Sequence, residues 1–116
     1  MRKLLILALL LCSTSSMAQA FNRVWISEFA IFRVQAAAPF ATLPALVQQP
    51  VLDLTGGAKT SAAFNSQTRY IRIVCEMQCT VSAAGVATVN SILLPALKPE
   101  YFGVQSGKTI SVILAP

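Results

Sequence analysis

Apolar side chains alternate with a two-residue period in short runs along this chain, and no long run repeats every 3.6 residues. The first such run, from Arg23 to Val34, carries apolar residues on both alternating faces. It predicts one long strand, or two strands with a bend, buried on both sides for part of the length. Pro39, Pro44 and Pro50 follow. Because proline fixes φ and lacks an N–H donor, residues 40–49 are expected to cross the surface as extended chain or a short helical turn.

The middle of the chain contains a short strand and a connection rich in small residues. Val51 to Thr55 predicts the strand, which Gly56 and Gly57 end. Residues 58–66 then form the connection, and Phe64 is its one large apolar residue. We therefore expect Phe64 to anchor this segment in the core.

Residues 69–83 predict a β-hairpin with a three-residue loop at 76–78. That loop places Cys75 opposite Cys79 and Ile73 opposite Val81. One face of the hairpin would then be apolar and buried, with Ile71, Ile73, Cys75, Cys79, Val81 and Ala83. The other face would meet solvent, with Tyr70, Arg72, Val74, Thr80 and Ser82.

Three further runs predict strands over residues 89–94, 100–104 and 109–114. The turn at Gln105-Ser106-Gly107, with a left-handed glycine, would pair the last two strands and place Phe102 opposite Ile110. About six to eight short strands result. The sequence therefore predicts an all-β fold, a small antiparallel β-sandwich or a partly closed barrel.

Residues 1–20 do not share this β pattern. Arg2 and Lys3 precede an apolar run from Leu4 to Leu11, and Ala18-Gln19-Ala20 has the form of a signal-peptidase site. We expect a signal peptide over residues 1–20, a single β domain over residues 21–116, and export to the periplasm or the medium. The apolar run is too short to cross a bilayer, so no membrane span is expected. Lipidation at Cys12 is the alternative, but it normally needs a small residue where Leu11 stands.

Composition excludes several chemistries. The chain is 55% hydrophobic, 11% charged and contains no histidine, so it has no histidine-based triad and no histidine metal ligand. Its four acidic residues form no local carboxylate pair. We therefore expect no enzyme, no catalytic residue, no metal and no cofactor. The formal net charge of +5 falls by two when Arg2 and Lys3 leave with the signal peptide. The remaining basic residues are scattered singly, which argues against a nucleic-acid partner.

Cys75 and Cys79 are the only cysteines after residue 20. Redox motifs usually separate their cysteines by two residues at the start of a helix, and a zinc site would need two more ligands. Directly opposed strand residues have Cα atoms close enough for a disulfide, and disulfides form in the oxidising compartments to which proteins are exported. A structural disulfide between Cys75 and Cys79 is therefore predicted.

A possible binding surface combines Tyr70 and Arg72, which share one face of a strand, with Trp25 and Tyr101. Aromatic rings and a guanidinium on one surface can stack on a sugar or another planar group. Ordinary cross-strand packing of the same residues is the alternative interpretation.

Several short motifs occur in a fixed order along the chain. They are Glu28-Phe29, Thr68-Arg69, Leu94-Pro95-Ala96, Glu100-Tyr101-Phe102 and the segment from Gly107 to Ile113. In these motifs and their order the chain resembles small virion-associated proteins of tailed bacteriophages and prophages. The resemblance implies a structural, decoration-like component of a virion. The chain departs from that pattern in its signal peptide and in Leu97, where a glycine-containing turn is expected.

Two functions follow from these observations. The first is a non-enzymatic structural module that associates with itself or joins a larger protein assembly, such as a virion, through strand edges or apolar surface. The second is an exported β-sandwich that binds a glycan or a peptide through Trp25, Tyr70, Arg72 and Tyr101.

Overall fold

The computed structural model describes residues 22–30, 33–35, 38–40 and 44–116. These described residues form eleven strands and no helix. The predicted signal peptide and its cleavage site after Ala20 lie outside the described residues.

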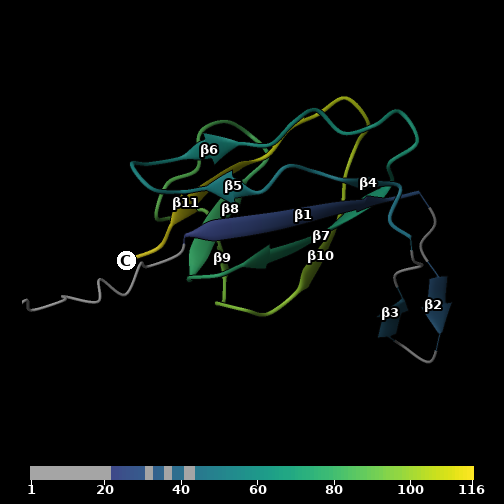
Figure 1. Ribbon diagram of the computed structural model, residues 1–116, viewed down its shortest axis with the longest axis horizontal. Coiled ribbons are helices and arrows are strands. Elements are labelled where there is room, and N and C mark those ends of the chain that lie inside the picture. The colour runs from purple at the N-terminus through teal and green to yellow at the C-terminus, as the bar shows by residue number, and fades with distance from the viewer. Residues whose placement is uncertain (1–21, 31–32, 36–37, 41–43) are drawn as a thin grey trace, which may run out of the picture.

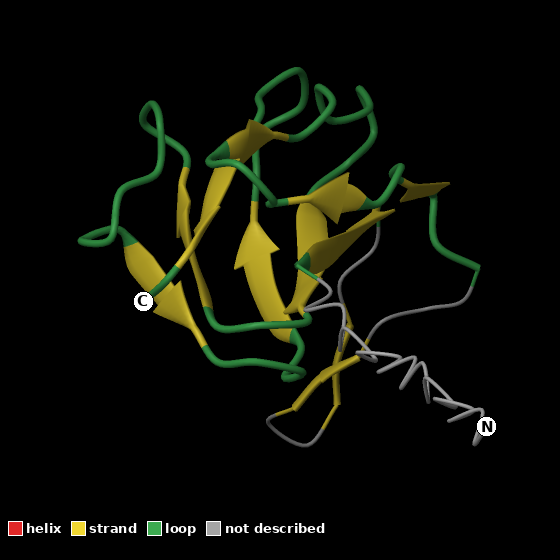
Figure 2. Cartoon of the chain, turned by 60° about the vertical axis from the view of Figure 1, so that its left-hand side comes forward, coloured by secondary structure: helices red, strands yellow, loops and turns green. Residues whose placement is uncertain are grey.

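Nine of the strands form two antiparallel sheets that pack face to face (Figures 1 and 2). The first sheet holds β1 (Arg23–Phe29), β4 (Val47–Gln48), β5 (Leu52–Asp53), β7 (Tyr70–Cys75) and β10 (Glu100–Gly103). The second holds β6 (Lys59–Thr60), β8 (Cys79–Ser82), β9 (Ile92–Leu94) and β11 (Ser111–Leu114). A separate pair joins β2 (Arg33–Gln35) to β3 (Ala38–Phe40).

The sheets are open at their edges, which confirms the predicted β-sandwich and shows that these nine strands form no closed barrel. The first sheet has the order β10-β7-β1-β4, with β5 also beside β1, and the second has the order β6-β11-β8-β9. There are more strands than predicted because β4 and β6 have only two residues each, too few to show an alternation. The short strand predicted over Val51 to Thr55 is β5.

The core lies between the sheets and is built mainly on β1 and β7. These two strands pair over six residues, with Ile26 opposite Ile73 and Glu28 opposite Ile71. Alternation sends Ile26, Ile71 and Ile73 inward, where they meet apolar residues of the second sheet. Phe64 is also buried there, as expected. The core cluster contains Val24, Ile26, Leu54, Phe64, Ile71, Ile73, Cys75, Cys79, Val81, Leu94, Ile110 and Val112.

The first predicted hairpin is wrong, because β7 and β8 belong to different sheets. β7 pairs with β1 and β10, whereas β8 pairs with β11 and β9. Residues 76–78 therefore cross from one sheet to the other. Ile73 and Val81 both face the interior as predicted, but from opposite sheets, and Ala83 is exposed. The six-residue ladder with β1 satisfies more of the β7 backbone than four-residue β8 could.

The second predicted hairpin is wrong for the same reason. Phe102 on β10 pairs with Ile71, whereas Ile110 leads into β11 of the second sheet. The local turn is nevertheless as expected. Gly107 has φ +76°, and the Lys108 N–H donates to the Gln105 carbonyl at 3.3 Å.

Leu97 holds a strained backbone conformation in the connection from β9 to β10. Its φ is +57°, in the left-handed region that glycine adopts freely, and its side chain is 69% exposed. The Leu97 N–H donates to the Cys75 carbonyl at 2.7 Å, and neighbouring Ala96 forms a parallel bridge with Cys75. These backbone contacts hold the turn where the sequence pattern leads one to expect a glycine.

Leu97→Gly is expected to raise the free energy of unfolding by about 1 kcal/mol, because glycine removes the Cβ penalty of the left-handed conformation. Leu97→Ala is the control, since it shortens an exposed side chain and keeps the Cβ. Urea titrations at low protein concentration would compare the two variants. Equal stability of the glycine and alanine variants would contradict the strain at this position.

Candidate functional site

The Cys75–Cys79 disulfide is confirmed, but it links the two sheets and not two strands of a hairpin. It joins the end of β7 to the start of β8, with the two Cα atoms 6.3 Å apart. Both cysteines are buried, at 1% and 0% exposure. The disulfide therefore links the two sheets at one end of the sandwich, beside the Leu97 turn, and its role there is structural.

The four residues of the predicted binding surface all lie on the outer face of the first sheet. Trp25 pairs with Val74, and Arg72 lies between Ser27 and Tyr101 in the register of β1, β7 and β10. Because inward-facing residues alternate with these positions, Trp25, Arg72 and Tyr101 face away from the core. All three are half-buried.

Tyr70 belongs to the same face but is only 3% exposed. Its ring stacks on that of Phe29, with centroids 5.1 Å apart and planes 13° apart. Tyr101 lies 6.5 Å from the Tyr70 ring at a tilt of 45°. Tyr70 thus packs among aromatic rings, and Trp25, Arg72 and Tyr101 are the members of the group that solvent reaches.

Trp25 also has a cationic neighbour. The Arg23 guanidinium carbon lies 5.2 Å from the centre of the indole ring, and Arg23 Nε pairs with Glu76 Oε2 at 2.7 Å. Such a cation over an indole is favourable in itself. A ligand that stacks on this side of Trp25 would have to displace the Arg23 guanidinium.

Glu28 is a buried polar residue that was noted only as part of the Glu28-Phe29 motif, with no role predicted for it. Alternation along β1 sends its side chain inward with Ile26, and it is 1% exposed. The carboxylate accepts hydrogen bonds from the Thr68 hydroxyl at 2.6 Å, the Asn65 N–H at 2.8 Å and Gln49 Nε2 at 3.0 Å. The donors stand on the segments that follow β4 and precede β7. Glu28 therefore fastens both segments to the central strand.

Gln49 extends this buried network. It is 3% exposed, its Nε2 also donates to the Ala62 carbonyl at 3.2 Å, and its Oε1 accepts from the Ala62 N–H at 3.2 Å. The Gln49 amide orientation is thus set by Ala62, which turns Nε2 toward Glu28. The signal in the sequence was a single carboxylate within an apolar run, since a charge at such a position must find buried partners.

The pKa of Asp53 is lowered by hydrogen bonds within its own turn. The Thr55 hydroxyl and the Thr55 N–H donate to Asp53 Oδ1 at 2.7 and 2.9 Å, and these hydrogen bonds lower the pKa of the carboxyl group. This arrangement closes the turn after β5 on the exposed surface.

Exposed apolar side chains concentrate near β9. Five of the eight large apolar residues that are exposed in the described part of the chain fall within residues 86–97. They are Val86, Val89, Ile92, Leu93 and Leu97, with exposed fractions from 55% to 75%. Single exposed apolar residues are ordinary, and only neighbouring ones mark an interaction surface. Ile92 and Leu93 are neighbours on the edge strand β9, whereas Val86 lines a hollow with Thr60 of β6 and Ser111 of β11. We call these five residues the β9 apolar group.

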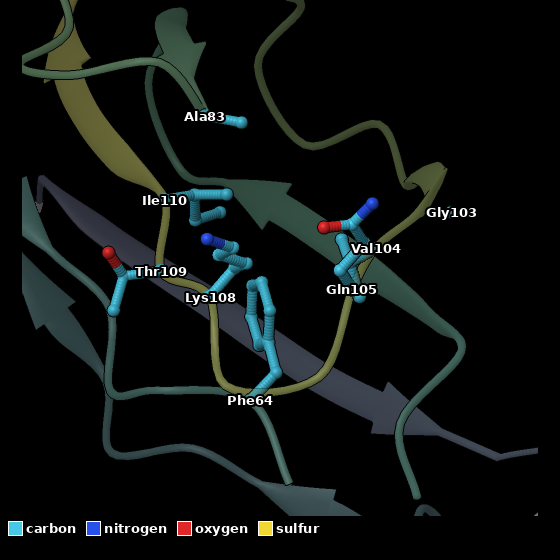
Figure 3. A pocket seen from close by; sticks show the side chains of 8 residues that line it. All are labelled: Phe64, Ala83, Gly103, Val104, Gln105, Lys108, Thr109 and Ile110. Atoms are coloured by element: carbon cyan, nitrogen blue, oxygen red, sulfur yellow. The ribbon is translucent and has the colours of Figure 1, made fainter. Parts of the chain in front are cut away.

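An apolar groove runs along the open side of the sandwich, between β9 and β10. One part, of about 240 Å³, is lined by Ile73 and Val81 from the core and by Ile92 and Phe102 from the two edges. An adjoining part, of about 300 Å³, has the Phe64 ring between the Val104 and Lys108 side chains (Figure 3). The two parts share Ala83, Gly103, Val104 and Ile110. On the opposite side of the sandwich, β5 and β6 lie in contact.

Comparison of the chain with protein-family models, with curated proteins and with solved structures found no match. Among the described residues no group of three or more His, Cys, Asp or Glu side chains is placed to hold a metal ion. The described part of the chain also contains no helix long and apolar enough to cross a membrane.

Proposed function

We propose that this protein is an exported, non-enzymatic structural module that builds into a protein assembly. The observation that carries the proposal is the β9 apolar group, five exposed large apolar side chains within residues 86–97. Leaving that surface in water is unfavourable, and a protein neighbour would cover it. The order of motifs that resembles small virion-associated proteins of tailed bacteriophages supports a place in a virion.

Export is supported by two features. The leader-like pattern at residues 1–20 predicts cleavage after Ala20. The Cys75–Cys79 disulfide is compatible with an oxidising compartment, where such bonds form and persist.

The exported protein is expected to be larger than a monomer in solution. Expression of the full chain with its leader, followed by light scattering on a sizing column from micromolar to submillimolar concentration, should give a mass above that of one chain. Intact-mass analysis of the same material should show Phe21 as the first residue. A monomer at every concentration would contradict the assembly role, and a retained Met1 would contradict export by cleavage.

A glycan-binding or peptide-binding module is the second candidate. The outer face of the first sheet favours it, because Trp25, Arg72 and Tyr101 are half-buried on that one face. Trp25 is the single tryptophan of the chain, so its fluorescence would report a ligand that displaces Arg23 from the ring. Saturable fluorescence changes with an oligosaccharide, together with a monomeric protein, would favour this candidate over assembly.

A further inference from the structure

The edge strand β9 exposes apolar side chains on both of its faces. It pairs with β8 alone, with Ile92 opposite Val81 and Leu93 opposite Thr80. Ile92 therefore shares the inward face of buried Val81, and Leu93 points to the opposite face. Their exposed fractions are 57% and 56%.

Because both faces of β9 are exposed, the geometry of a partner decides whether it can cover both Ile92 and Leu93. A partner that lay flat on one face of the sheet would cover either Ile92 or Leu93 and leave the other in water. A strand added alongside β9 would cover both, because side chains of neighbouring strands flank one another on each face. Strand addition would also satisfy the backbone groups that an edge leaves without a ladder partner.

The groove supports the same contact from the inside. Ile92 lines it on one side, and Phe102 and Val104 line it on the other. A strand beside β9 would bring an inward-facing apolar side chain next to Ile92, at the open side of the sandwich. That side chain would shield the groove from water.

The absence of charged side chains around β9 favours a second copy of this chain as the partner. Residues 77–97 contain no charged side chain, although the whole chain has a net charge of +5. Three other edge strands carry charge, with Glu100 on β10, Lys59 on β6 and Asp53 on β5, whereas the two-residue edge strand β4 does not. Two copies of this chain that meet at β9 therefore bring no like charges together within the contact.

Symmetry and length favour a second copy further. An antiparallel pair of identical strands is self-complementary about a twofold axis, so one surface serves both partners. Pro95 follows β9 directly and cannot donate to a ladder, which keeps the pairing short. The exposed side chains of Ile92 and Leu93 must then supply much of the affinity.

We propose that β9 pairs antiparallel with β9 of a second copy of this chain, forming a twofold dimer whose contact is centred on Ile92 and Leu93. This inference rests on the proposed assembly function and names the contact through which assembly begins.

Leu93→Lys tests the dimer, because it places two ammonium groups near the twofold axis. Leu93 is more than half exposed on the outward face, so the single chain should fold. We expect the dissociation constant of the dimer to rise at least about 100-fold, since like charges brought together at a contact are strongly unfavourable. Val51→Lys is the matched control, because Val51 is 48% exposed beside β5, and its dissociation constant should match that of the wild type. Light scattering on a sizing column over a dilution series measures both variants.

The outcomes separate this inference from the proposed function. A wild-type dimer that Leu93→Lys dissociates and Val51→Lys preserves supports both. A wild-type assembly that Leu93→Lys leaves intact overturns the β9 contact, while assembly by another surface still stands. A wild-type monomer at every concentration overturns the assembly role and the β9 dimer together.

Hydrogen exchange on the wild-type protein gives the same test without any variant. The β9 amides that point away from β8 should gain protection as the concentration rises through the dimer transition, because they alone lack a ladder partner in the single chain. If dimers form while these amides keep the same exchange rates, the β9 pairing is wrong.

Discussion

Glu28→Ala is expected to lower the free energy of unfolding by about 3 to 5 kcal/mol, because three donors, two of them on buried side chains, lose their shared acceptor and each unsatisfied buried group is costly. The donors belong to Thr68, Asn65 and Gln49. Urea titrations followed by Trp25 fluorescence would measure the change. Glu76→Ala is the matched control, since it removes a carboxylate that pairs with half-exposed Arg23 near the surface and should cost under about 1 kcal/mol. Equal losses in the two variants would contradict the role of Glu28.

Glu28→Gln separates the hydrogen bonds of the carboxylate from its volume. The new amide would turn an NH₂ group toward Gln49 Nε2, and two donors cannot satisfy each other. Rotation of the Gln49 amide would relieve that conflict but break both of its hydrogen bonds to Ala62. We expect the stability of Glu28→Gln to lie between those of the wild type and Glu28→Ala. A glutamine variant as stable as the wild type would show that the fold does not depend on two acceptor oxygens at this position.

Ile73→Ala is expected to lower the free energy of unfolding by about 2 to 5 kcal/mol through lost burial and the cavity that remains. Ile73 is 1% exposed at the centre of the first sheet. Removal of the disulfide by Cys75→Ala with Cys79→Ala should cost about 2 kcal/mol, because the bond closes a short loop. Urea titrations under oxidising conditions compare the two. A cysteine-free protein that fails to fold, beside an Ile73→Ala variant close to wild type, would reverse this order of importance.

The sequence pattern predicted the longer strands but not which of them pair. Alternation requires only that Ile73 and Val81 share an interior, and that condition holds whether β7 and β8 lie side by side or face each other from two sheets. A three-residue connection with a disulfide fits both arrangements. The choice depends on β1, whose six-residue ladder with β7 joins positions far apart in the chain, and such long-range pairing leaves no local signature.

The candidate surfaces were predictable to different degrees. The disulfide followed from two cysteines at a suitable spacing, and the shared face of Trp25, Arg72 and Tyr101 needed the register of three strands. Burial of Tyr70 depends on its stacking with Phe29, a neighbour set by the same register. The exposure of Ile92 and Leu93 was hidden in the sequence, because an apolar run indicates a strand without showing whether that strand is central or at an edge.

The repeated crossings between the two sheets have a consequence for how the chain folds. β10 and β11 come last in the chain, and one completes each sheet, so neither sheet is whole until residues 100–114 are available. Most pairings thus join distant segments, a topology of high contact order that folds slowly. A nascent chain that stops short of residue 100 would lack a strand from both layers. Neither sheet of this sandwich can therefore be completed before the C-terminal strands are synthesised.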